Sequence, residues 1–195
     1  MSKITVFNNV TLDGVMQAPG RQDEDLRGNF QYGGWASPYA DPDLGRAAGE
    51  SMAQTDALLF GRRTYEDFYK VWPNRTDNPF TKVLNNTPKY VASTTLKEPL
   101  PWRNSALLKG DVVQAVRKLK SQPGKDIVIL GSGVLIQSLM QHNLIDQYTL
   151  LITPLILGTG RRMFPDAGPF IDLQLVDCKP TSTGVVVATY QPKAK

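Results

Sequence analysis

The chain reads Val128-Ile129-Leu130-Gly131-Ser132-Gly133 where a short apolar segment ends. Such a run is typical of a strand buried on both faces, and residues 134–142 carry the apolar spacing of a helix. Glycines let a ligand approach the backbone at a turn, and the start of a helix attracts negative charge. We therefore predict that Gly131, Ser132, Gly133 and Val134 bind the pyrophosphate of a dinucleotide.

An ordinary strand-to-helix turn explains the same glycines equally well, because glycine is common in such turns. Ile136 stands where the third glycine of the dinucleotide fingerprint G-x-G-x-x-G would lie. The stretch therefore does not favour a doubly wound Rossmann domain. The fold has to be inferred from the chain on either side of it.

Strands and helices alternate on both sides of this stretch, except that the last two strands follow one another without a helix. This order predicts an α/β fold with a mostly parallel sheet and an antiparallel pair at its C-terminal end. A Gly- and Pro-rich segment, 13–34, follows the first strand, and loops of that length are usually functional or mobile. The predicted strands are 4–10, 56–60, 89–93, 106–109, 126–130, 147–153, 173–177 and 185–190, and the predicted helices are 41–54, 62–71, 79–85, 111–120 and 134–142.

The composition is that of one ordinary globular domain, which we expect to span residues 1–195. The net charge of +4 comes from scattered basic residues without a basic stripe, so a nucleic-acid partner is not expected, whereas an anionic small molecule fits. Cys178 is the one cysteine and His142 the one histidine, which excludes a disulfide within the chain and a cysteine- or histidine-rich metal cluster. Cys178 lies in an apolar run, and we expect it to be buried.

Residues 3–7 already form a strand-like run, and no signal peptide precedes them. No stretch approaches the 18 or so apolar residues that span a membrane. The expected location is therefore the cytoplasm, without a membrane partner.

Two further groups of phosphate-binding side chains follow predicted strands. Arginines in Gly61-Arg62-Arg63-Thr64 can pair with a phosphate; the alternative is two solvated arginines on a first helical turn, where the helix dipole disfavours them. The run Ser93-Thr94-Thr95 can hold a ribose 2′-phosphate or form an ordinary turn. Because ligands bind outside the carboxyl ends of strands in α/β sheets, we expect these groups and the glycine turn to form one site.

Four segments of the chain resemble a known family. Thr11-Leu12-Asp13-Gly14 resembles a signature of the C-terminal reductase domain of bacterial bifunctional riboflavin-biosynthesis enzymes, and Gly61-Arg62-x-Thr64-Tyr65-Glu66 is similar to a segment of dihydrofolate reductases. The glycine turn at 128–133 resembles the pyrophosphate turn that both share, and residues 153–164 resemble their P-x-x-L-G-x-G-x-x-x-F run. The matches occur in family order from Ile4 to Tyr190.

The resemblance implies a dihydrofolate-reductase-like, three-layer α/β/α fold with a mixed sheet of about eight strands. It also implies hydride transfer from NADPH to a pterin-like or pyrimidine-like compound, and a homodimer. Asp13 and Gly14 match a loop that closes over the nicotinamide. The family's cofactor-phosphate contacts carry over to Arg62 and Thr64, and a threonine near the substrate carries over to Thr153.

The chain also departs from both patterns. One cysteine and one histidine cannot build the zinc deaminase domain that usually accompanies the riboflavin reductase. Val134 follows the turn where dihydrofolate reductases often have a basic residue. The carboxylate that protonates the pterin has no clear counterpart: the acidic run 23–25 lies roughly there, and it can equally be a solvated loop. We take Asp13, Asp25 and Glu50 as candidate catalytic residues.

Several functions remain open. The first is reduction of 5-amino-6-(5-phosphoribosylamino)uracil, with Arg161 and Arg162 binding the ribose phosphate of this substrate. The others are dihydrofolate reduction, an orphan reductase of the same fold, and a non-catalytic dinucleotide-binding protein. NADPH is the expected cofactor in each case, and no metal is expected.

Overall fold

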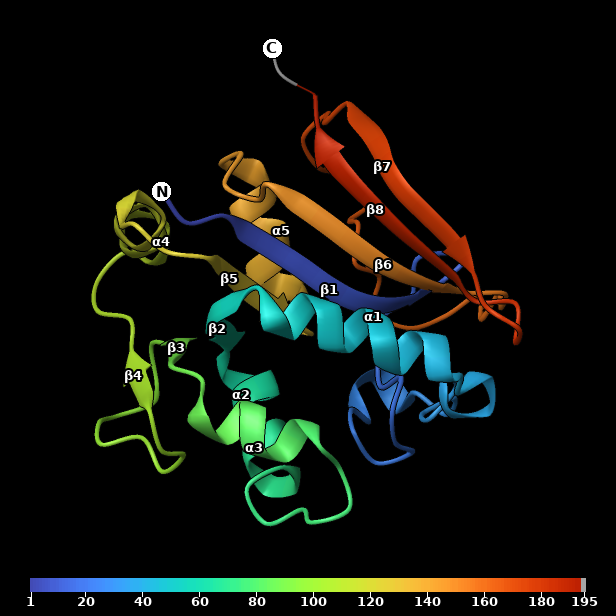
Figure 1. The fold of residues 1–195 in the computed structure, drawn as a ribbon, viewed down its shortest axis with the longest axis horizontal. Coiled ribbons are helices and arrows are strands. Elements are labelled where there is room, and N and C mark those ends of the chain that lie inside the picture. The colour runs from blue at the N-terminus through green and yellow to red at the C-terminus, as the bar shows by residue number, and fades with distance from the viewer. Residues whose placement is uncertain (194–195) are drawn as a thin grey trace.

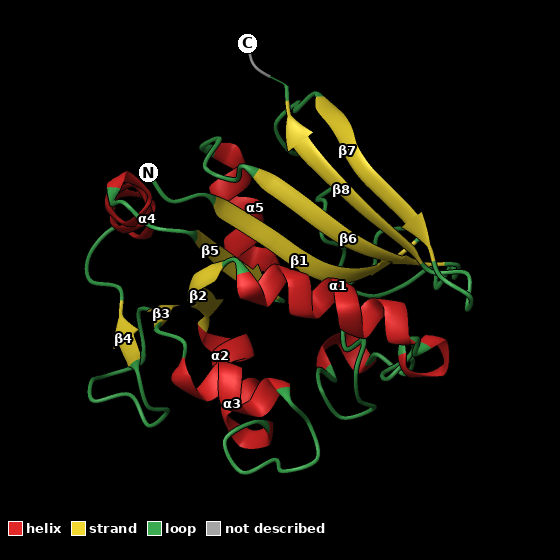
Figure 2. Cartoon of the chain, viewed as in Figure 1, coloured by secondary structure: helices red, strands yellow, loops and turns green. Residues whose placement is uncertain are grey.

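The computed structural model describes residues 1–193 and contains one eight-stranded sheet with helices on both faces (Figures 1 and 2). Every strand and helix predicted from the sequence is present, with ends displaced by a few residues. The strands are β1 Ile4–Thr11, β2 Thr55–Gly61, β3 Lys89–Ala92, β4 Ser105–Leu107, β5 Asp126–Leu130, β6 Gln147–Thr153, β7 Leu173–Pro180 and β8 Val186–Pro192. The helices are α1 Pro42–Ala53, α2 Arg62–Val71, α3 Phe80–Asn86, α4 Val112–Ser121 and α5 Gly133–Gln141.

The strand order is β4-β3-β2-β5-β1-β6-β8-β7. Strands β1 to β6 run parallel to one another, whereas β8 runs antiparallel to β6 and β7 antiparallel to β8. This is the mostly parallel sheet with an antiparallel C-terminal pair that the sequence predicts, and the α/β expectation is confirmed. Figure 1 shows β7 at the outer edge of the sheet.

Alternating side chains of the central strands divide the core into two layers. Leu59 and Ile129 pack with α4 and α5 on one face, whereas Leu58, Phe60 and Val128 pack with α2 and α3 on the other. Helix α1 crosses that second face (Figure 1) and is only half-buried there. A strand covered on both faces has to be apolar throughout, which is why β2 and β5 read as continuous apolar runs.

The long segment between β1 and α1 is folded rather than open. It contains two short 3-10 turns, Arg27–Asn29 and Ser37–Tyr39, and a small apolar cluster built around Phe30 and Trp35. The indole of Trp35 donates a hydrogen bond to the backbone oxygen of Gln17 at 2.7 Å. The segment therefore has a defined path beside the carboxyl end of β1.

One residue that the sequence predicts to be buried is exposed in the structure. Cys178 lies on β7 and is exposed. The expectation was wrong because β7 is an edge strand, and most of its residues face solvent whatever their polarity.

Candidate functional site

A cleft of about 1040 Å³ opens at the carboxyl ends of β1, β2, β3 and β5. Its walls come from α1, α2, the start of α5 and the long segment after β1. This is the edge of an α/β sheet at which ligands bind. All predicted cofactor-binding residues except Gly14 line it, namely Gly61, Arg62, Arg63, Thr64, Ser93, Thr94, Gly131, Ser132, Gly133 and Val134.

The two strand-to-helix turns of the cleft are joined by hydrogen bonds. The backbone N–H of Ser132 donates to Thr64 Oγ1 at 3.0 Å, and the N–H of Gly61 donates to Ser132 Oγ at 3.0 Å. Helices α2 and α5 therefore begin side by side at the cleft. Because the first N–H groups of a helix lack partners within it, the pair presents converging donors and two positive dipole ends to an anion.

The glycine turn adopts an unusual backbone. Gly131 and Ser132 have φ angles of 61° and 60°, both in the left-handed region. A Cβ atom on Gly131 would lie 2.9 Å from Cγ2 of Thr64, so glycine is required there for contact as well as for conformation. Non-glycine residues in this region cost on the order of 1–3 kcal/mol and cluster at functional sites.

Asn8, a residue that the sequence analysis missed, holds the glycine turn by hydrogen bonds from β1. It lies on β1, lines the cleft and is almost fully buried. Its Oδ1 accepts from the N–H of Gly131 at 2.6 Å, and its Nδ2 donates to the Gly131 carbonyl at 3.2 Å. A polar side chain inside a strand that is otherwise buried was the sequence signal that could have identified it.

Arg62 and Arg63 differ in their partners. Arg62 forms an ion pair with Glu66 one turn along α2 at 3.0 Å. Arg63 is exposed and has no ion pair among residues 1–193. Arg63 therefore has no ion pair to break before it binds a phosphate.

The hydroxyls after β3 have separate roles. Ser93 Oγ accepts from the N–H groups of Thr95 and Leu96 at 3.1 and 3.0 Å, which stabilises its own turn. Thr94 is exposed on the cleft wall beside it. Residues 93–96 therefore form the ordinary turn. The Thr94 hydroxyl has no hydrogen bond to any described residue and is available to a ligand.

Asp13 lies just outside the cleft lining and stabilises the loops. It accepts hydrogen bonds from the Thr11 hydroxyl at 2.6 Å and from the N–H of Gly158 at 2.9 Å. Burial acts to raise the pKa of Asp13, but these bonds and the one from Leu157 lower it below its usual value. The carboxylate is therefore ionised at neutral pH. Its neighbour Gly14 has a φ angle of 78° and also lies outside the lining.

The other two candidate catalytic carboxylates are placed differently. Asp25 lines the cleft, where burial acts to raise its pKa but the ion pair with Arg27 lowers it overall. Glu50 lies on the exposed side of α1, paired with Arg46 at 3.3 Å, and is not among the residues that line the cleft.

Of the three residues expected near the substrate, two line the cleft and one does not. Arg161 and Arg162 line the cleft, and Arg162 forms ion pairs with Asp13 at 4.0 Å and Asp166 at 3.8 Å. The N–H of Arg161 donates to Gln17 at 2.9 Å, which ties this segment to the loop after β1. Thr153 is buried at the end of β6 and does not line the cleft.

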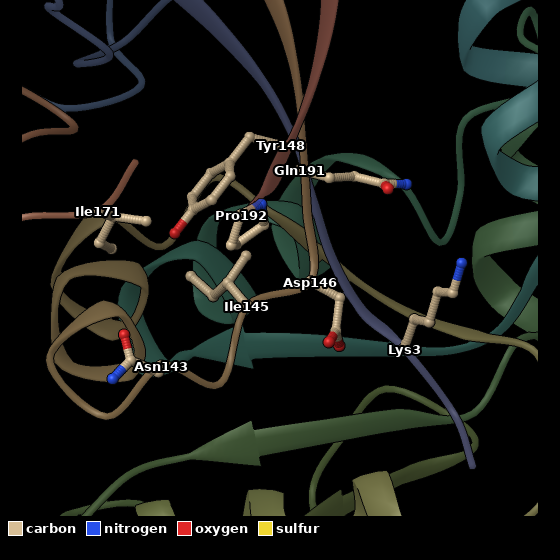
Figure 3. Close-up of a pocket in the computed structure, with 8 residues that line it drawn as sticks. All are labelled: Lys3, Asn143, Ile145, Asp146, Tyr148, Ile171, Gln191 and Pro192. Atoms are coloured by element: carbon tan, nitrogen blue, oxygen red, sulfur yellow. The ribbon is translucent and has the colours of Figure 1, made fainter. Parts of the chain in front are cut away.

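A second pocket, of about 310 Å³, lies at the opposite edge of the sheet (Figure 3). It contains none of the residues predicted for a site. Lys3 and Asp146 lie directly before β1 and β6, and Tyr148, Gln191 and Pro192 also line the pocket, as Figure 3 shows. The amino ends of parallel strands are not where α/β sheets bind ligands.

Within residues 1–193 no group of three or more histidines, cysteines, aspartates or glutamates could hold a metal ion. No helix in the same part of the chain is long and apolar enough to cross a membrane.

Known proteins resemble the chain over nearly its whole length. The RibD C-terminal domain family matches residues 2–187. The protein YyaP of Bacillus subtilis (strain 168), described as uncharacterised, is 33% identical over 186 residues, which is 93% of this chain and 90% of YyaP.

Solved structures show the same fold at lower identity. A putative riboflavin biosynthesis protein from Shewanella sp. PV-4 superposes with a TM-score of 0.75 at 24% identity, covering 98% of this chain and 99% of that one. A pyrimidine reductase-like protein from Corynebacterium diphtheriae gives a TM-score of 0.67 at 13% identity, covering 99% and 92%. Dihydrofolate reductase from Enterococcus faecalis, complexed with NADP(H), gives 0.63 at 14% identity, covering 98% and 97%.

These neighbours confirm the dihydrofolate-reductase-like fold that the sequence motifs predict. The family match covers all four motifs, from Thr11 to Phe164, on which that prediction was based. The chain belongs to the RibD C-terminal domain family.

Proposed function

We propose that the protein is an NADPH-dependent oxidoreductase that transfers hydride to a small conjugated heterocycle. The observation that carries this proposal is the Thr64–Ser132 hydrogen bond, which sets two helix N-termini side by side at the cleft. A pyrophosphate bridges such a pair of donors well. Family membership and the dihydrofolate-reductase-like fold support a reductase.

The residues present fit the cofactor. Gly131 to Val134 and the start of α2 would hold the pyrophosphate, while Arg63 and Thr94 would hold the ribose 2′-phosphate. Bound NADPH supplies the hydride, and the chain has to orient donor and acceptor and exclude water. The loop after β1 is placed for that task, because Met16 Sδ lies 2.7 Å from where a Cβ on Gly133 would stand.

We take 5-amino-6-(5-phosphoribosylamino)uracil as the first substrate to test. Arg161 and Arg162 line the cleft and would pair with its ribose phosphate. Replacing both by alanine should then weaken turnover of this compound. If turnover is unchanged, the phosphate assignment is wrong, and dihydrofolate or another heterocycle becomes the better candidate.

The first experiment is a titration of the protein with NADPH and NADH, followed by tryptophan fluorescence. Trp72 lines the cleft and should report binding. We expect tight NADPH binding and weaker NADH binding. Thr64→Val removes the acceptor of the Ser132 N–H at almost constant volume and should weaken binding, whereas Thr76→Val, at an exposed position outside the cleft lining, is the matched control.

A non-catalytic dinucleotide-binding protein would give the same titration. The second step is therefore NADPH oxidation, measured by absorbance, with the pyrimidine phosphate and with dihydrofolate. A reductase oxidises NADPH with an acceptor, whereas a pure binding protein oxidises it with none. Binding of neither nucleotide would remove the oxidoreductase proposal altogether.

We also propose that the protein forms a homodimer. Strand β7 is an edge strand whose outer hydrogen-bonding groups have no partner strand among residues 1–193. Leu175 and Val176 on it are more than half exposed, and Phe170 just before it is 95% exposed. Apolar side chains gathered on an open edge are characteristic of a surface that another chain covers.

A further inference from the structure

We propose that Glu24 is the acid that protonates the substrate during reduction, an assignment that rests on the proposed function. Glu24 lines the cleft from the loop after β1. The same cleft is lined by the end of β1, by α1 and by α2, so an acceptor bound beside the cofactor lies within the space that Glu24 borders.

Helix α1 offers no acid to the cleft. Its residues that line the cleft are Ala48, Ser51 and Met52, while Glu50 points away into an ion pair with Arg46. The carboxyl groups that line the cleft all come from the loop after β1 or from α2.

Ion pairs distinguish the five carboxylates that line the cleft. Four of them form an ion pair with an arginine, whereas Glu24 forms none among residues 1–193. An arginine partner stabilises the ionised carboxylate and so opposes proton donation. The four pairs are Asp23 with Arg21 at 3.3 Å, Asp67 with Arg21 at 2.6 Å, Glu66 with Arg62 at 3.0 Å, and Asp25 with Arg27.

Backbone N–H groups hold the Glu24 carboxyl group through one of its two oxygens. Oε2 accepts from the N–H of Gly20 at 2.8 Å and from the N–H of Arg21 at 3.1 Å. Oε1 has no hydrogen bond to any described residue. The group is thus oriented by the backbone and keeps one oxygen to carry a proton and donate it.

The surroundings of Glu24 shift its pKa upward, toward the protonated form. Burial raises the pKa of Glu24, and the Asp67 carboxylate of α2 raises it further. The two N–H groups and the charge of Arg21 act in the opposite direction without cancelling that effect. General acids work best when their pKa lies nearer to neutral pH than that of a solvated carboxyl group.

The reaction balances with Glu24 in this role. NADPH, when bound, would be the reductant: its hydride would add to the carbon of a C=N or C=O bond of the substrate, and the cofactor would leave as NADP⁺. The electron pair of that double bond moves to the nitrogen or oxygen, which takes the proton from Oε1 of Glu24. Glu24 is left as a carboxylate and regains a proton from solvent.

Glu24→Gln is the variant that tests the assignment. The glutamine oxygen can still accept from Gly20 and Arg21, so the loop keeps its hydrogen bonds while the acid is lost. Glu98→Gln is the matched control, since Glu98 also accepts a backbone hydrogen bond, from Leu107 at 3.2 Å, and lies outside the cleft lining. Three measurements apply: NADPH affinity by fluorescence, the pH dependence of kcat with whichever of the two acceptors is reduced, and a carbon-13 NMR titration of the four glutamate carboxyls.

We expect the Glu24 carboxyl to titrate above the ordinary glutamate range and Glu24→Gln to keep its NADPH affinity. We also expect kcat to fall by roughly 100-fold or more. In the wild type, kcat should decline as pH rises through the Glu24 pKa, and the variant should lose that decline. An ordinary Glu24 pKa, or kcat within about twofold of wild type, overturns the assignment and leaves the reductase proposal standing. Failure of the wild-type protein to bind or oxidise NADPH overturns both.

Discussion

The side chain of Asn8 binds both polar groups of Gly131, accepting from its N–H at 2.6 Å and donating to its carbonyl at 3.2 Å. Gly131 belongs to the turn where α5 begins, and Asn8 to the strand next to β5 in the sheet. The amide thereby sets how the first N–H groups of α5 face the cleft. Its position links the central strand of the sheet to the proposed pyrophosphate site.

Replacing Asn8 by alanine should weaken both the fold and the site. The change leaves the half-buried N–H and C=O of Gly131 without these partners, which costs at most about 1–3 kcal/mol. We expect a lower midpoint in urea denaturation and at least tenfold weaker NADPH binding. Asn74→Ala, at an exposed position outside the cleft lining, is the control. If Asn8→Ala unfolds at the same urea concentration as wild type, the two hydrogen bonds contribute nothing to stability.

Gly131→Ala should disrupt the cleft through a contact that a second change can relieve. The new Cβ would meet Thr64 Cγ2 at 2.9 Å, in addition to the strain of a positive φ angle. Thr64→Ser removes Cγ2 but keeps the hydroxyl that accepts from Ser132. The double variant should recover part of the NADPH affinity that Gly131→Ala loses, measured by fluorescence titration. Recovery of none would mean that backbone strain alone causes the loss.

Arg63 should determine the preference for NADPH over NADH. It is the arginine of the pair without an ion-pair partner among the described residues, and the 2′-phosphate is what distinguishes the two nucleotides. We expect Arg63→Met to weaken NADPH binding about tenfold, equivalent to ~1.4 kcal/mol, and to leave NADH binding nearly unchanged. Arg117→Met, at an exposed arginine on α4 outside the cleft lining, is the control. Equal weakening of both nucleotides would place Arg63 at the pyrophosphate instead.

The sequence predicted the sheet well because its central strands are covered on both faces and are therefore apolar throughout, as in β5. It also predicted residues that the fold brings together along one cleft, since glycines and arginines at strand ends are local signals. Asn8 and Glu24 could not be assigned in that way. Their roles depend on contacts with Gly131 and on the ion pairs of neighbouring carboxylates, which only the tertiary structure brings together. Cys178 was misjudged because sequence polarity does not reveal which strand is at the edge.

Lys89 should make the free energy of unfolding depend on pH in the alkaline range. It is almost fully buried, with Nζ donating to the carbonyls of Leu84 and Thr87, both at 2.7 Å, and lying 4.6 Å from the Trp102 ring centroid. Burial, with a smaller effect of Arg103, lowers the pKa of Lys89 from 10.5 to about 8. Between these two values the unfolded chain holds a proton that the folded chain has lost, so the free energy of unfolding should rise with pH.

Lys89→Met removes this titration, and the difference between the two proteins isolates it from other groups. Relative to the variant, wild type should gain up to ~1.4 kcal/mol per pH unit between pH 8 and 10.5 in urea denaturation. A flat difference would show that the carbonyl oxygens and the Trp102 ring hold the ammonium form as strongly as water does. The variant is expected to fold, because the methionine side chain is apolar and of similar length.

The edge of β7 should carry the dimer contact. Leu175 is 56% exposed there, and an unpaired edge with apolar side chains favours pairing with a second copy. Leu175→Lys puts a charge on that edge and should convert a dimer to a monomer, as measured by light scattering after size-exclusion chromatography. Val83→Lys, at a partly exposed apolar position of α3, is the control and should leave the dimer intact. A wild-type protein that elutes as a monomer at high micromolar concentration contradicts the dimer, and a Leu175→Lys variant that stays dimeric places the contact on another surface.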